Sequence, residues 1–171
     1  MSREFTFDEI IMEPERFSSL AQSGRQDMYY VAALTVVALC NYTVSDENCH
    51  AMLDMIKNPA QPTSVYEKQF LRDRLRGKEY KPFSYFSGAS PMNGYTPDEP
   101  YKITVESNPY SFTGEDRAVL YLRSGGADSP RQIGLRKKLS TGEWFLVEQF
   151  LLSDIRDPVR NEAGETVDPW G

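Results

Sequence analysis

Met28-Tyr-Tyr-Val-Ala-Ala-Leu-Thr-Val-Val-Ala-Leu-Cys40 is the longest apolar segment of this 171-residue chain, and the expected fold is built around it. It is apolar on every face of a helix, and a helix of that kind is normally the central, fully packed one. A pair of parallel strands would give a similar run, but the length and the three alanines favour a helix. The run includes Thr35 and is well short of the ~20 residues that a membrane span requires. We therefore expect a buried central helix and no membrane-spanning segment.

Helical patterns flank this stretch between residues 13 and 77. Pro14 suits the first turn of one helix. Ser45-Asp46 has the capping chemistry to start another, which carries a single apolar stripe. Ser64-Val-Tyr-Glu67 fits a capping box, and Gly77 suits the left-handed residue that follows a helix end. The helical half is thus predicted to hold three to four helices.

Beyond Pro100 the apolar residues recur with period two, which is typical of strands. The predicted strands are 101–106, 117–123, 131–139 and 144–150. Their short connections imply antiparallel neighbours, so residues 101–152 are predicted to form a four-stranded meander. Phe5-Thr-Phe7 is compatible with a further short strand, but the pattern is brief and the predicted four-stranded sheet does not include it.

Helices first and strands afterwards predict an α+β domain whose helices cover one face of the sheet. No linker divides the chain, so we expect residues 1–171 to form a single domain. Residues 78–100 are rich in proline, glycine and aromatic residues; a loop this long is either functional or held by its own side chains. Residues 153–171 are predicted to be a solvated tail whose Val167, Pro169 and Trp170 are able to dock back.

Charge and cysteine content exclude several classes of protein. The chain has 19 Lys and Arg against 25 Asp and Glu, a net charge of −6, which is opposite to that of a general nucleic-acid binder. Cys40 and Cys49 are too few for a disulfide framework and are expected to be buried thiols in a reducing compartment. The first ten residues lack the features of a signal peptide. These observations predict a cytoplasmic protein.

Acid–base and metal-ligating groups are scarce. His50, the one histidine of the sequence, follows Cys49, and such neighbours point about 100° apart on a helix, so no Cys–His pair is predicted. Cys40, Cys49 and His50 are fewer than the four ligands of a structural zinc site. The glycine-rich loop Ser124–Ser129 joins two strands and lacks the lysine of a phosphate-binding loop. We expect no metal, no cofactor and no catalytic residue.

The chain contains two clusters of basic residues although its net charge is negative. Their members are Lys68, Arg72, Arg74, Arg76, Lys78 and Lys81 in the first, and Arg131, Arg136, Lys137 and Lys138 in the second. They are either a solvated helix face and a charged edge strand that resists aggregation, or a surface that contacts a polyanion or an acidic partner. Arg136 and Lys138 are the candidate binding residues of the second interpretation.

Aromatic residues mark the segment 83–97. Tyr85, Phe86 and Tyr95 either line a concave apolar site for a ligand or partner, or cap the open end of the sheet and pack on the apolar helix. Solvent accessibility separates these alternatives. Full burial of the three rings would remove the anchor of the binding hypothesis.

Several sequence segments from Lys78 onward are specific: Lys81-Pro-Phe-Ser-Tyr-Phe-Ser-Gly-Ala-Ser-Pro-Met-Asn-Gly-Tyr-Thr-Pro97, Gly126-Ala-Asp-Ser-Pro130, Ser140-Thr-Gly-Glu-Trp-Phe-Leu146, Glu148-Gln-Phe-Leu-Leu152 and Asp168-Pro-Trp170. Together they resemble an uncharacterised family, a domain of unknown function in small cytosolic proteins of Clostridia-like gut bacteria. The resemblance implies a bacterial, intracellular origin and a self-contained domain. It brings no activity and no catalytic residue.

Three functions are therefore compatible with the sequence. The first is a non-enzymatic module that binds a small molecule or a protein through the segment 83–97. The second is a small enzyme with a pocket between its helices and a curved sheet, by analogy with the nuclear-transport-factor fold, holding Glu106 or Glu148 beside a tyrosine. The third, a weak polyanion binder, is disfavoured for nucleic acid by the net charge. The ligand or partner and the oligomeric state are not indicated.

Overall fold

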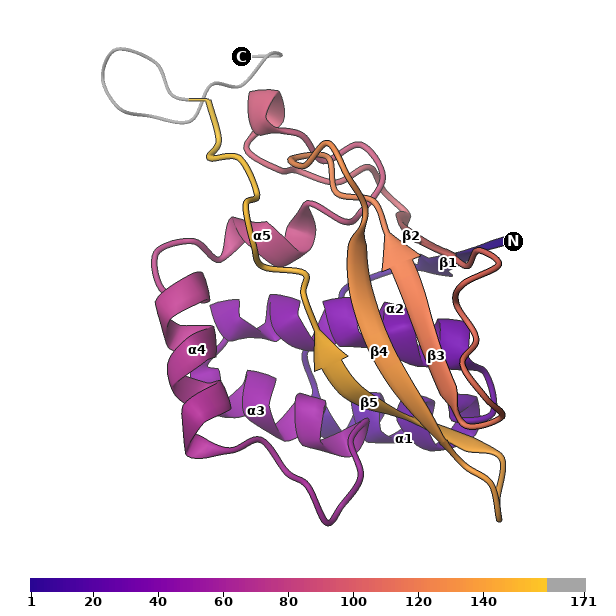
Figure 1. Ribbon diagram of the computed structural model, residues 1–171. Coiled ribbons are helices and arrows are strands. Elements are labelled where there is room, and N and C mark those ends of the chain that lie inside the picture. Colours follow the sequence, from indigo (N-terminus) through magenta and orange to yellow (C-terminus); the bar gives the residue numbers. More distant parts are fainter. Residues whose placement is uncertain (160–171) are drawn as a thin grey trace.

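A computed structural model describes residues 1–159, and this part of the chain forms an α+β fold with one five-stranded antiparallel sheet (Figure 1). The strands, in the order β1-β2-β3-β4-β5, are Ser2–Phe7, Tyr101–Glu106, Arg117–Leu122, Arg131–Lys138 and Glu143–Gln149. The helices α1 to α5 are Pro14–Gly24, Met28–Cys40, Asp46–Met55, Val65–Leu75 and Tyr80–Phe83, with the short 3₁₀ turns η1 (Asn41–Thr43) and η2 (Pro91–Asn93).

The central position predicted for α2 is confirmed. Every residue from Val31 to Cys40 is buried. The Asp27 carboxylate starts the helix by accepting hydrogen bonds from the backbone N–H groups of Tyr29 and Tyr30. One side of α2 contacts α1, α3 and α5, while the other contacts β1, β2 and β5, and Figure 1 shows it running behind the strands. The helical layer and the sheet therefore share one core built around α2.

The helix ends that the sequence predicts are also confirmed. Ser45 Oγ accepts from the backbone N–H of Asn48 at 3.0 Å, and Ser64 forms the capping box with Glu67. Gly77 adopts the left-handed conformation, with φ of +76°, where a residue with a side chain would be strained. Local chemistry alone thus sets where α3 and α4 begin.

The number of strands is a correction. The predicted sheet has four strands, but the described chain has a fifth, β1, which pairs along its whole length with β2, from Ser2 opposite Glu106 to Phe7 opposite Tyr101. Only Phe5 and Phe7 give β1 an apolar face, and both rings pack against Tyr30 of α2. The strand is stabilised by a partner about 100 residues away, which a local sequence pattern does not reveal.

The other edge strand, β5, is only partly covered. The backbone N–H groups of Trp144 and Leu146 donate to the carbonyls of Arg25 and Ile56, each at 2.8 Å. A β-bulge interrupts the pairing of β4 with β5 between Gly134 and Leu135. Among the described residues, no backbone N–H of β5 after Leu146 donates to a carbonyl outside the sheet, and the Val147 side chain is exposed.

Within residues 1–159, no helix is both long enough and apolar enough to cross a membrane.

Candidate functional site

The three rings of the aromatic segment are buried in the core, although Tyr85 and Phe86 also line one side of a surface hollow. Tyr85, Phe86 and Tyr95 are only 4%, 2% and 2% exposed. The Tyr85 hydroxyl donates to the carbonyl oxygen of Leu151, and that of Tyr95 donates to the carbonyl of Arg156, both at 2.5 Å. This burial favours the alternative in which the three rings pack in the core, and a role for them in binding stays a prediction of the sequence.

These tyrosines belong to a set of donors, here called the clamp, that holds the chain after β5. Its members are Tyr85, Tyr95, Lys81 and Arg131. The Lys81 ammonium donates to the carbonyl of Leu152 at 3.0 Å, and Arg131 Nε donates to that of Ser153 at 2.9 Å. Burial raises the pKa of Tyr85 well above its ordinary value of 10.0, so its hydroxyl stays protonated and able to donate. Which carbonyls these residues meet depends on tertiary contacts that the sequence pattern does not encode.

The interior between the helices and the sheet is filled. Leu34, Val36 and Leu39 of α2 have no exposed surface, so this space does not form the pocket that the nuclear-transport-factor analogy requires. Glu106 lines a hollow of about 380 Å³ beside the aromatic segment, but its carboxylate is paired with Arg123 at 3.1 Å. The tyrosine beside that hollow, Tyr85, already donates to Leu151.

The nucleophile candidates are inert. Burial raises the pKa of Cys40, and it raises that of Cys49 to about 12, so both remain thiols at neutral pH. Desolvation, with a smaller effect of the nearby Lys68, lowers the pKa of His50. Among residues 1–159, no group of three or more His, Cys, Asp or Glu side chains is placed to hold a metal ion.

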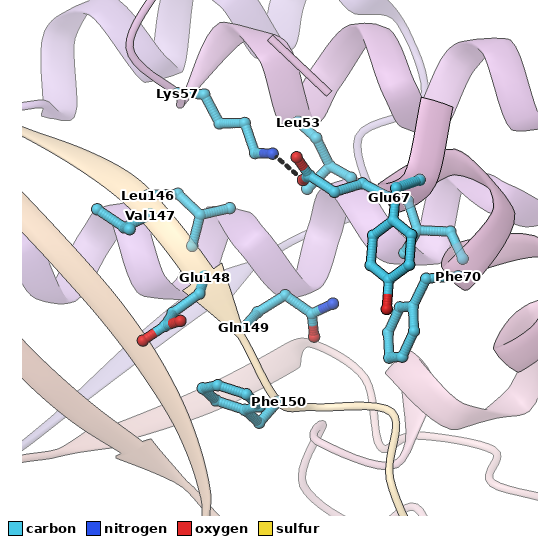
Figure 2. Close-up of a pocket in the computed structure, with 11 residues that line it drawn as sticks. Leu53, Lys57, Glu67, Phe70, Leu146, Val147, Glu148, Gln149 and Phe150 are labelled. Carbon is cyan, nitrogen blue, oxygen red and sulfur yellow. Dashed lines mark hydrogen bonds and ion pairs between the residues drawn. The ribbon is translucent and has the colours of Figure 1, made fainter. Parts of the chain in front are cut away.

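Two hollows flank the edge strand β5, and they are the candidate site. The first, here called the apolar hollow, has a volume of about 260 Å³ and lies between α4 and the end of β5 (Figure 2). Its lining residues are Leu53, Lys57, Tyr66, Glu67, Phe70, Leu71, Leu146, Val147, Glu148, Gln149 and Phe150. The Lys57 ammonium pairs with the Glu67 carboxylate here, and Phe70 lines the hollow from α4 while Phe150 lines it from the chain just after β5 (Figure 2).

The second, here called the basic hollow, is larger, at about 570 Å³. It is lined by Arg25, Asn58, Pro59, Gln61, Asp116, Arg136, Lys137, Lys138, Leu139, Glu143, Phe145, Leu146 and Val147. Both predicted residues of the β4 cluster, Arg136 and Lys138, lie here. The α4 cluster does not join them, because its cations are not among the residues that line either hollow. The two basic clusters therefore do not form a single surface at this site.

Cations outnumber carboxylates in the basic hollow by four to two. Asp116 Oδ2 lies 3.7 Å from Arg136 Nε, and Glu143 Oε2 lies 3.9 Å from one terminal nitrogen of Arg25. The Arg25 guanidinium lies over the Phe145 ring, with its carbon Cζ 5.2 Å from the ring centroid, and it donates to the carbonyl of Met55. Lys138 is exposed and adds to the positive charge that remains. The hollow is therefore suited to a negatively charged group.

The apolar and basic hollows are neighbours along β5, because Leu146 and Val147 line both. We call the combined feature the β5 groove. Sequence reasoning found its Arg136, Lys138 and Glu148 but missed Arg25, Phe70 and Val147. Arg25 follows a helix and Phe70 looks like an ordinary residue of an amphipathic helix, so neither carries a local signal. The alternating sequence pattern of β5 did not predict the β-bulge next to Val147 either.

Comparison with known proteins identifies a family but no function. A family model described as a domain of unknown function, DUF6935, matches residues 12–159. No curated protein and no solved structure matches the chain.

Proposed function

Because the chain belongs to the DUF6935 family, whose description carries no activity, we propose from the geometry that it is a non-enzymatic binding module. Its recognition surface is the β5 groove and not the aromatic segment 83–97. The observation that carries this proposal is the pair of neighbouring hollows along β5, where the side chains of Val147 and Phe150 are exposed.

Exposed apolar residues gather at this edge. Val147 is 44% exposed, Phe150 49% and Tyr66 77%, and all three line the apolar hollow. Edge strands with exposed apolar side chains are prone to pair with other chains, and natural proteins usually cover or charge them. An edge left open beside a preformed groove is typical of surfaces that take up a peptide.

The charged groups of the groove favour recognition over catalysis. Glu67 is paired with Lys57, and Asp116 lies near Arg136, so these carboxylates are engaged with cations. A general acid or base needs a group free to exchange a proton with a substrate. Glu148, the carboxylate named in the enzyme alternative, is exposed at an open surface where water is not excluded.

A polyanion remains the second candidate, on the strength of the cation excess in the basic hollow. It is disfavoured because the net charge of the chain is −6 and the groove is acidic at Glu148. A bacterial source and a cytoplasmic location also stay predictions of the sequence.

The test is selection from a displayed library of random dodecapeptides. Enriched peptides should bind the Val147→Asp variant at least tenfold more weakly than the parent, because the substitution places a charge on a residue that lines both hollows. Val44→Asp is the matched control, since Val44 is 52% exposed and lies outside the groove. Circular dichroism and thermal unfolding check that both variants fold.

Two results would overturn the proposal. One is that no peptide is enriched over successive rounds. The other is that the enriched peptides bind the Val147→Asp and Val44→Asp variants equally well.

A further inference from the structure

We infer that the β5 groove takes an extended polypeptide segment that carries acidic side chains at one end and an apolar anchor at the other. This inference rests on the proposed function and specifies the chemistry of the partner. It follows from three features of the groove: its charge polarity, the position of its apolar end, and its length along a strand.

The basic hollow selects the acidic end of the segment. Arg136 and Lys138 project from the open face of β4, where Arg136 is opposite Phe145 and Lys138 is opposite Glu143. Asp116 and Glu143 offset only part of the positive charge of four cations. Arg136 and Lys138 are both exposed, so an incoming carboxylate would meet accessible hydrogen-bond donors and a positive potential there.

The apolar hollow selects the anchor. Leu53 and Leu71 belong to the buried core and form part of the lining of this hollow, while Phe70 and Phe150 flank it. A volume of about 260 Å³ accommodates one aromatic or branched aliphatic side chain. Two carboxylates line this hollow, and Glu67 is neutralised by Lys57, so Glu148 gives this end a charge opposite to that of the basic hollow.

The shape of the groove requires an extended segment. The two hollows follow β5 from Glu143 to Phe150 and share Leu146 and Val147, so an occupant that reaches both must run along the strand. A strand rises about 3.3 Å per residue, and Phe145 and Phe150, which belong to opposite hollows, are five residues apart. An acidic residue and an anchor about four to six positions apart in the partner would fill both hollows at once. Nucleic acid fits less well, because its phosphates would meet Glu148 at the far end.

The experiment uses the same displayed dodecapeptide library, read by sequencing. Enriched peptides should carry Asp or Glu four to six positions from an aromatic or branched aliphatic residue. The double variant Arg136→Glu with Lys138→Glu should lose at least tenfold in affinity for these peptides and enrich Lys or Arg in place of the acids. Arg72→Glu with Arg76→Glu is the matched control, because these exposed cations of α4 lie outside the groove.

The outcomes separate this inference from the proposed function. If peptides are enriched and depend on Val147 but show no acidic preference, the groove binds peptides and the inference about the partner is wrong. If the enriched peptides of the double Glu variant still carry acidic residues, the basic hollow does not determine the charge of the bound segment, and the inference is likewise wrong. A single-stranded oligonucleotide is tested alongside the peptides. If it binds more tightly than any enriched peptide, and if this binding is lost in the same double variant, the partner of the groove is a polyanion and not a peptide. Arg136→Gln with Lys138→Gln, which adds no repulsion, repeats the measurement should the Glu variant fail to fold.

Discussion

Replacing Tyr85 by Phe tests whether the aromatic segment is a structural clamp. The substitution keeps the ring in the core and removes only the hydroxyl, which donates to the carbonyl of Leu151 at 2.5 Å. Both residues are buried, at 4% and 0% exposure, so water does not readily replace the lost donor.

The expected loss follows from that geometry. A hydrogen bond of this kind contributes about 1 kcal/mol net, and leaving a buried carbonyl unpaired costs about 1–3 kcal/mol. Some relaxation of the chain after β5 reduces the penalty, because the other clamp residues still hold it. We expect Tyr85→Phe to lower the free energy of unfolding by about 1–2 kcal/mol, a fall in Tm of about 2–8 °C for a domain of this size.

Urea and thermal unfolding followed by circular dichroism measure this loss. Tyr110→Phe is the matched control, because Tyr110 is 84% exposed and its change should be within ±0.5 kcal/mol. Binding of groove-selected peptides should be unchanged in both variants. If Tyr85→Phe were as stable as Tyr110→Phe, or if it abolished peptide binding while remaining folded, the clamp interpretation would be refuted.

Two further predictions concern buried polar groups. Burial raises the pKa of Cys49 from 9.0 to about 12, so between these pH values the unfolded chain has lost a proton that the folded chain keeps. This group's contribution to stability is complete below pH 9 and should fall by about 1.4 kcal/mol per pH unit above it. Urea unfolding at pH 8 and 10 should show a shallower decline for Cys49→Ala, and an unchanged pH slope would contradict the burial argument. Glu67→Gln should destabilise the fold by about 1–2 kcal/mol more than Lys57→Met. The reason is that Glu67→Gln leaves the Lys57 ammonium without its carboxylate, although the Lys57 side chain is only 8% exposed. Equal losses of the two variants in chemical denaturation would contradict this prediction.

Much of the architecture could be predicted from local chemistry. The capping box at Ser64, the left-handed residue at Gly77 and the all-apolar face of α2 are each set by neighbouring residues, and each is confirmed. The number of strands could not be predicted, because β1 is short and gains its stability from β2 at the other end of the sequence. The same reason explains why the aromatic segment was open to two interpretations: its hydroxyl partners lie more than 60 residues away.

Residues close together in the chain are enough to predict the capped helices, the period-two strands and the buried central helix. That Tyr85 and Tyr95 hold the chain after β5, and that Arg25, Arg136 and Val147 line one hollow, became evident from the folded molecule alone. Caps and amphipathic patterns involve residues three or four positions apart, whereas the groove combines residues from distant parts of the chain that one shared hydrophobic core brings together.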